Sequence, residues 1–136
     1  MTRTQAREQA FIIIFEKEFN SEYSLDEIIE AARDAELFEP DSFAVALSQK
    51  TLDELERLDN EITSNLKGGW KLSRISKVAL AILRLAVCEM MDFPDIPVSV
   101  SINEAVDLAK KYAAEEDYSF VNGLLASVSR SLTANV

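Results

Sequence analysis

Apolar residues recur at spacings of three and four along nearly the whole chain. No stretch alternates apolar and polar residues, as a half-buried β-strand does. The pattern predicts an all-α fold of six or seven helices. Only three glycines and three prolines occur in 136 residues, too few for a turn-rich all-β protein. The length is that of one domain, which we expect to span residues 1–136.

Short polar motifs mark where the helices should begin. Ser24-Leu-Asp-Glu27 and Ser101-Ile-Asn-Glu104 both read as capping boxes, in which a hydroxyl and a carboxylate satisfy free amides of a first helical turn. Asp41 is placed to cap a third helix, over about residues 42–66. The length of that helix predicts a bend or break near residues 58–60.

Glycine and tryptophan give further local expectations in the second half. Gly68-Gly69 should stop the third helix, and Trp70 should pack under the turn that follows. Gly123 lies inside the last predicted helix, where glycine costs about 1 kcal/mol relative to alanine. We therefore expect a neighbouring helix to approach closely at Gly123.

The segment of about residues 75–91 is apolar on nearly every side, which predicts a central helix that the others surround. Arg84 interrupts this apolar helix and needs a partner, because an unpaired buried charge is very costly. Glu89 or Glu104 could supply a structural ion pair. Cys88 has apolar neighbours and should be an inert packing residue.

Several kinds of site are excluded by composition. The chain has no histidine and one cysteine, so it cannot build serine–histidine or cysteine–histidine catalysis, a disulfide framework or a zinc–thiolate cluster. We expect no enzymatic activity, no catalytic residue, no metal and no cofactor. The longest apolar run, Val78 to Met91, is interrupted by charges and is shorter than the ~20 residues that cross a bilayer. These features predict a cytoplasmic protein without a membrane span.

The charges are unevenly distributed. Residues 22–61 hold thirteen acids and three bases, so this segment has a net charge of −10, the same as that of the whole chain. Residues 67–84 hold five bases and no acid. Both tracts are compatible with solvated helix faces. Alternatively, the basic band makes a small nucleic-acid contact, or a basic partner docks on the acidic tract.

The first predicted helix, about residues 4–19, carries Arg3, Arg7, Phe11 and Phe15 at intervals of four. Two guanidiniums and two rings along one edge of a helix could hold phosphates and stack bases. The same spacing is produced by two core phenylalanines beside arginines that solvate the helix start. The residues alone leave both readings open.

The second half also carries motifs that resemble those of the bacterial NusB family of transcription antitermination factors. An Ala6-Arg7-Glu8 start before an apolar helix is similar to the N-terminus of that family. The more specific matches are Trp70, Arg74-Ile75, Ile82-Leu-Arg-Leu-Ala86 with Glu89, Asp95-Ile-Pro97, Ile102-Asn-Glu-Ala-Val106, Leu108-Ala-Lys110 and Ser119-Phe-Val-Asn-Gly-Leu124. Order and spacing agree over essentially the whole chain.

The resemblance implies a single helical domain of two packed halves, about residues 1–69 and 70–136. It implies binding to the boxA RNA of ribosomal RNA leader transcripts, together with the ribosomal protein NusE. In that role the protein would join the antitermination complex of RNA polymerase and support rRNA maturation. The alternative is a non-catalytic interaction or dimerisation module, which would form a homodimer and would have weak or lost RNA binding.

The resemblance also implies which residues contact RNA. The arginines of the N-terminal segment would hold phosphates, aromatic rings would stack on bases, and one carboxylate would accept a hydrogen bond from a base. The corresponding residues are Arg3, Arg7, Phe15, Tyr112, Glu116 and Phe120. The arginine-rich segment is thin here and the net charge is −10, so we predict weak RNA binding by the chain alone and tighter binding with a basic NusE-like partner.

Overall fold

The computed structural model describes residues 1–134, and within them the chain forms seven α-helices, one short 3₁₀ helix and no strand. The all-α prediction is confirmed. The elements are α1 (Arg3–Phe19), α2 (Leu25–Asp34), α3 (Ser42–Asp53), α4 (Leu55–Ser64), η1 (Leu72–Arg74), α5 (Lys77–Asp92), α6 (Val98–Tyr112) and α7 (Glu115–Ala134). None of these helices is both long enough and apolar enough to span a lipid bilayer.

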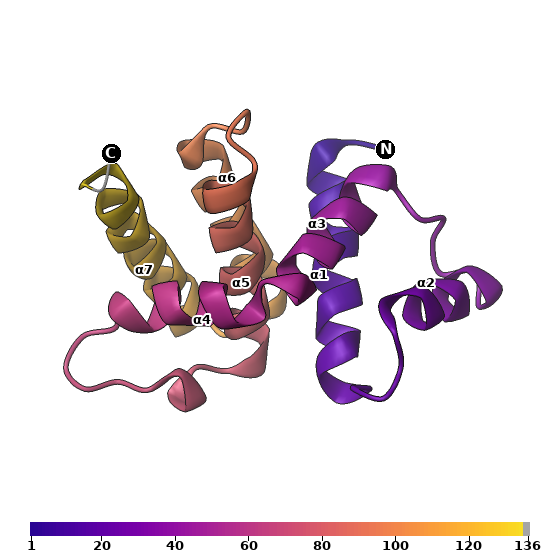
Figure 1. Cartoon of the computed structure of the whole chain (residues 1–136), viewed down its shortest axis with the longest axis horizontal. Coiled ribbons are helices and arrows are strands. Elements are labelled where there is room, and N and C mark those ends of the chain that lie inside the picture. The colour runs from indigo at the N-terminus through magenta and orange to yellow at the C-terminus, as the bar shows by residue number, and fades with distance from the viewer. Residues whose placement is uncertain (135–136) are drawn as a thin grey trace.

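Helix α5 lies at the centre, as its apolar composition predicts. It contacts α1, α3, α4, α6 and α7, and nine of its sixteen residues are buried. Figure 1 shows α4 crossing in front of α5, with α1 and α2 on one side and α6 and α7 on the other. Burial of so much of one apolar helix supplies the main hydrophobic driving force of the fold.

The helix starts of the first half follow the predicted chemistry. Ser24 and Glu27 form the expected capping box at α2, and the Asp41 carboxylate accepts from two amides at the start of α3. Thr2 and Gln5 form a further capping box at α1 that was not predicted. These side chains satisfy amides that the first turn of a helix leaves without a partner.

The break in the third predicted helix was placed wrongly. It falls at Glu54, which separates α3 from α4, and not at residues 58–60. Leu58 is fully buried in the middle of α4, and the Asp59 carboxylate is held by the Arg84 guanidinium of α5. Asp59 therefore joins α4 to α5 through Arg84 and does not interrupt α4.

The capping box predicted at residues 101–104 is also wrong. Helix α6 begins one turn earlier, at Val98 after Pro97, and this puts Ser101 inside the helix. The Ser101 hydroxyl is buried and donates to the Glu89 carboxylate, 3.0 Å away. The Glu104 carboxylate accepts from the hydroxyl of Thr4 on α1. Both side chains join helices instead of capping one.

The turn between α4 and α5 differs from the prediction in two details. Helix α4 ends at Ser64, before the glycines, and Gly68 and Gly69 then adopt left-handed φ values of 64° and 75°. Such values suit glycine because it has no Cβ. Trp70 does not pack under this turn, because its side chain is 56% exposed.

Candidate nucleic-acid interface

Four aromatic side chains form a continuous row between α1 and the end of α6, here called the aromatic ridge. It comprises Phe11, Phe15, Phe19 and Tyr112. Ring centroids are 5.6 Å apart for Phe11–Phe15, 4.9 Å for Phe15–Phe19 and 4.9 Å for Phe11–Tyr112. Phe11 is buried, Phe15 is half-buried, and Phe19 and Tyr112 are exposed. The ridge is thus anchored at Phe11 and offers rings to solvent on either side of it.

The polar edge of the ridge is tied to α1 by Glu8. Its carboxylate accepts hydrogen bonds from the Lys111 ammonium, 2.7 Å away, and from the Tyr112 hydroxyl. These bonds, with Lys111 contributing most, hold the pKa of Glu8 below its usual value. Burial and the neighbouring Glu8 raise the pKa of Tyr112. The Tyr112 hydroxyl therefore stays protonated near neutral pH, and Glu8 neutralises Lys111.

The start of α5 lies beside the carboxyl end of α1. The Lys77 ammonium is 5.8 Å from the centroid of Phe19 and 3.0 Å from the Glu18 carboxylate. Next to it, the Ser76 hydroxyl lies 3.4 Å from a carboxylate oxygen of Asp117, in the acidic first turn of α7. Exposed Glu116 occupies the same turn. Phe15 and Tyr112 are therefore linked through Phe11, and Glu116 lies in the turn of α7 that meets the start of α5.

Phe120 belongs to a second aromatic group at the same end of α7. Its ring centroid is 6.2 Å from that of Trp70, and the two rings line a cleft of about 400 Å³. Gly123 also lines this cleft, and nothing lies within 4 Å of where its Cβ would be. The predicted close approach of a helix at Gly123 is therefore wrong, and glycine leaves open space there instead.

The segment before α5 brings positive charge to this cleft. Lys67 lines it, and Lys71 and Arg74 follow in and beside η1. All three side chains are exposed, and within residues 1–134 none of them makes an ion pair. In Figure 1 this segment and the carboxyl end of α1 both lie at the lower edge of the molecule. The sequence indicated these cations only through the basic band of residues 67–84, from which no individual RNA contact could be predicted.

The two N-terminal arginines are not part of this end. Arg3 stands about 18 Å along the α1 axis from Phe15, and its guanidinium stacks on the Phe43 ring, 3.9 Å from the centroid. Arg7 is only 4% exposed, and its guanidinium donates two hydrogen bonds, of 2.8 and 3.0 Å, to Glu89. An RNA contact by Arg7 is incompatible with this position, because no phosphate can reach a buried guanidinium that is already paired.

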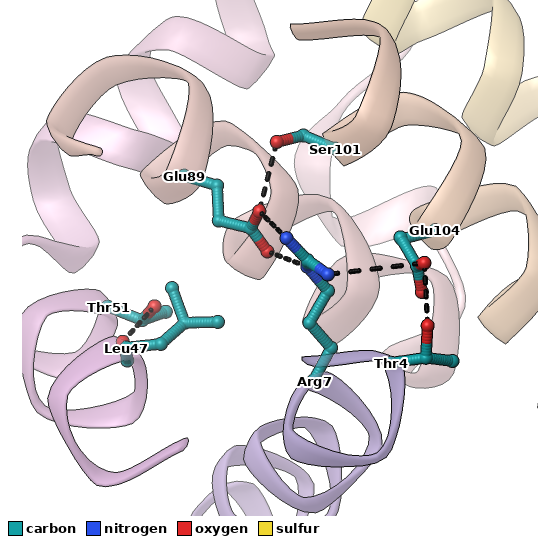
Figure 2. A network of polar contacts seen from close by, with 7 residues as sticks. All are labelled: Thr4, Arg7, Leu47, Thr51, Glu89, Ser101 and Glu104. Carbon is teal, nitrogen blue, oxygen red and sulfur yellow. Dashed lines mark hydrogen bonds and ion pairs between the residues drawn. The ribbon is translucent and has the colours of Figure 1, made fainter. Parts of the chain in front are cut away.

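Arg7 is instead the centre of a buried polar network (Figure 2). Glu89 receives a third hydrogen bond from Ser101, and the Arg7 guanidinium lies 4.0 Å from Glu104, which also accepts from Thr4. Among the described residues, every buried side-chain nitrogen and oxygen has a hydrogen-bond partner. The network joins α1, α5 and α6.

The ion pair predicted for Arg84 has different partners. Arg84 donates two hydrogen bonds of 2.8 Å to Asp59 and lies 3.7 Å from Glu18. Arg84 and Glu89 are five residues apart on α5, which puts them about 140° apart around its axis. Glu89 and Glu104 face Arg7, so neither pairs with Arg84.

Cys88 is fully buried on α5, where burial raises the pKa of its thiol to about 11. Such a thiol is protonated at neutral pH and is a poor nucleophile. In the part of the chain that the structure describes, no three acidic or sulfur-bearing side chains cluster closely enough to hold a metal ion.

A family model described as the NusB family matches residues 4–130. This chain belongs to the NusB family. A NusB transcription antitermination protein of Agathobacter rectalis is 45% identical over 130 residues, which cover 93% of this chain and 98% of that protein.

Solved structures of the NusB family share the fold. T. maritima NusB is 31% identical to this chain and superposes with a TM-score of 0.83, covering 96% of this chain and 92% of the other. A chain from a crystal structure of the antitermination factors NusB and NusE in complex with double-stranded RNA has a TM-score of 0.82 at 24% identity, covering 96% of this chain and 99% of the other. The resemblance seen in the sequence motifs is confirmed.

The buried network generates a prediction about stability. Arg7→Met should lower the free energy of unfolding by about 3–5 kcal/mol, because it leaves the Glu89 carboxylate buried without its cation. Arg84→Met is the matched control: its pair with Asp59 is partly exposed, and we expect a loss of about 1–2 kcal/mol. Urea unfolding followed by circular dichroism measures both. Equal losses in the two variants would contradict the assignment of Arg7 as the buried structural arginine.

Proposed function

We propose that this protein is an RNA-binding transcription antitermination factor. It binds the boxA element of ribosomal RNA leader transcripts together with NusE, within the antitermination complex of RNA polymerase, and it supports rRNA maturation. The observation that carries the proposal is one end of a NusB-family fold where Lys67 lines a cleft with Trp70 and Phe120. Lys67 and the exposed side chains of Lys71 and Arg74 that follow it have no acidic partner among residues 1–134. Its relatives in the family are named transcription antitermination proteins.

The chemistry of this end suits single-stranded RNA. Unstacked bases bind to proteins by stacking on exposed aromatic rings, and phosphates pair with lysine and arginine. We assign the rings of Phe15, Tyr112 and Phe120 to the bases. We assign Lys67, Lys71 and Arg74 to the phosphates, in place of Arg7, and Glu116 to a base amino group.

The overall charge bears on the role of the partner. A net charge of −10 repels a polyanion at long range. The RNA therefore has to be held by a small number of local cations. A basic partner would add positive charge next to them. The crystal structure of NusB and NusE in complex with double-stranded RNA, one chain of which has the same fold, supports NusE and RNA as partners. We therefore propose weak binding of RNA by this chain alone and tighter binding with NusE.

Three further points follow from the proposed role. We propose that residues 1–136 form one domain whose halves, about residues 1–69 and 70–136, share α5 as their common core. We propose that the protein catalyses no reaction, since an adaptor in this complex needs only to bind. We propose a cytoplasmic location, because bacterial RNA synthesis takes place there.

The proposal predicts the outcome of a titration with labelled RNA. Fluorescence anisotropy of a boxA RNA should rise at lower protein concentration when purified NusE is present, and a scrambled RNA should bind at least tenfold more weakly. Raising the salt concentration should weaken the boxA signal, because bound phosphates release counterions.

Other outcomes of that titration would contradict the proposal. NusE binding without any change in RNA affinity would indicate a protein-binding scaffold. If the protein bound neither NusE nor RNA, and sedimentation showed self-association that increases with protein concentration, it would be a homodimerisation module.

A second prediction locates the phosphate contacts. The double variant Lys71→Ala/Arg74→Ala should weaken boxA binding and reduce the slope of log K against log salt by about 0.7 for each lost contact. Arg33→Ala/Lys50→Ala changes the net charge equally on α2 and α3, where both side chains are exposed. This control should leave the slope unchanged. An equal effect of the two double variants would show that only total charge matters.

A further inference from the structure

A groove of about 640 Å³ runs between α1, α2 and the segment that follows α2. Ile12, Ile28 and Phe38 are partly exposed in its walls, and Leu37 and Tyr23 stand at its edge with 72% and 47% of their surface exposed. Exposed apolar side chains that line a groove mark a surface that another molecule can cover.

Acidic side chains surround this groove. Glu16, Glu27, Glu30 and Asp34 line it, and no basic residue does. Arg33 pairs with Glu30, 2.9 Å away. Within residues 1–134, no lysine or arginine forms an ion pair with any of the other three carboxylates. The groove therefore combines an apolar floor with an acidic rim, in which Arg33 offsets Glu30 and Lys17 acts on Glu27, whereas Glu16 and Asp34 make no ion pair among the described residues.

We propose that this groove binds a basic segment of a partner protein, which inserts an apolar side chain between α1 and α2. The apolar floor requires an apolar anchor, and the acidic rim favours lysine or arginine on either side of it. RNA does not fit, because its phosphates meet only carboxylates here. A symmetric dimer through this groove does not fit either, because each copy would bring the same acidic rim.

The groove is separate from the proposed RNA-binding end. On α1, Ile12 and Glu16 face the groove, whereas Phe11 and Phe15 belong to the aromatic ridge. Adjacent residues of a helix differ by about 100° around its axis, so these pairs point to different sides. Figure 1 shows α2 on the side of α1 away from α6 and α7. Both surfaces can therefore be occupied at once, and each can be tested without the other.

A designed peptide tests the proposal. The probe is a fluorescein-labelled 16-residue peptide of leucine and lysine, with leucines spaced three and four apart. The comparison peptide carries glutamate at every lysine position. We expect anisotropy to show binding of the lysine peptide at least tenfold tighter than that of the glutamate peptide. No binding of the lysine peptide, or equal binding of both, would overturn the proposal.

Charge-reversal variants assign the binding to the groove. Glu16→Lys/Asp34→Lys should weaken binding of the lysine peptide at least tenfold. Asp53→Lys/Glu56→Lys changes the net charge equally at exposed positions of α3 and α4 and should alter it less than twofold. Equal weakening in both variants would reduce the effect to total charge and overturn the proposal.

Two further readouts complete the test. Leu37→Glu, at a position 72% exposed, should also weaken peptide binding without loss of helical circular dichroism. Dimerisation that Glu16→Lys/Asp34→Lys abolishes would overturn the proposal in favour of a second copy of this chain. The affinity for boxA RNA, measured in the same variants, reports separately on the proposed function.

Discussion

One buried ion pair fixes α1 against the central helix, and the arrangement of the proposed site depends on that placement. Arg7 and Glu89 are 4% and 3% exposed, and their bidentate contact joins residues 82 positions apart in the chain. Ser101 of α6 satisfies Glu89 further. A buried charge without its partner is costly, so the pair holds α1 at one register along α5 and α6. That register brings Phe11 of α1 against Tyr112 of α6, and so joins Tyr112 to the three rings that α1 supplies to the aromatic ridge.

The same structure divides the surface by charge. Lys67, Lys71 and Arg74 have no acidic partner in the described residues, and Lys67 shares a cleft with the Trp70 and Phe120 rings at one end. The groove between α1 and α2 is instead lined only by acidic and uncharged residues. Because ionic contacts at a surface act over roughly 10 Å in salt, each region attracts its own class of partner despite the net charge of −10. An acidic protein can therefore bind RNA at one end and a basic protein segment at another surface.

Much of the fold followed from the sequence, because periodicity reports burial directly. The apolar spacing predicted the helices, and residues 75–91 predicted the central one. The site was harder to predict. One edge of α1 carries Arg3, Arg7, Phe11 and Phe15 at intervals of four, and this spacing is the same whether the edge faces solvent or core. Only the packing of α1 against the other helices buries Arg7. The role of Ser101 could not be predicted for the same reason. Its hydroxyl suits a helix cap, but in the structure it donates a hydrogen bond to the carboxylate of Glu89 on α5, twelve residues earlier in the chain.

Chemical-shift mapping of the RNA complex tests the central claim most directly. In amide NMR spectra of the labelled protein, with boxA RNA added in the presence of NusE and spectra with NusE alone as reference, the account predicts shifts in three segments. These are residues 67–77, the carboxyl ends of α1 and α6, and the first turns of α7 around Glu116 and Phe120. Amides around Arg7 and those of α2, which forms the far wall of the groove, should stay unchanged. Shifts concentrated at Arg3 and Arg7, with none in residues 67–77, would contradict the account.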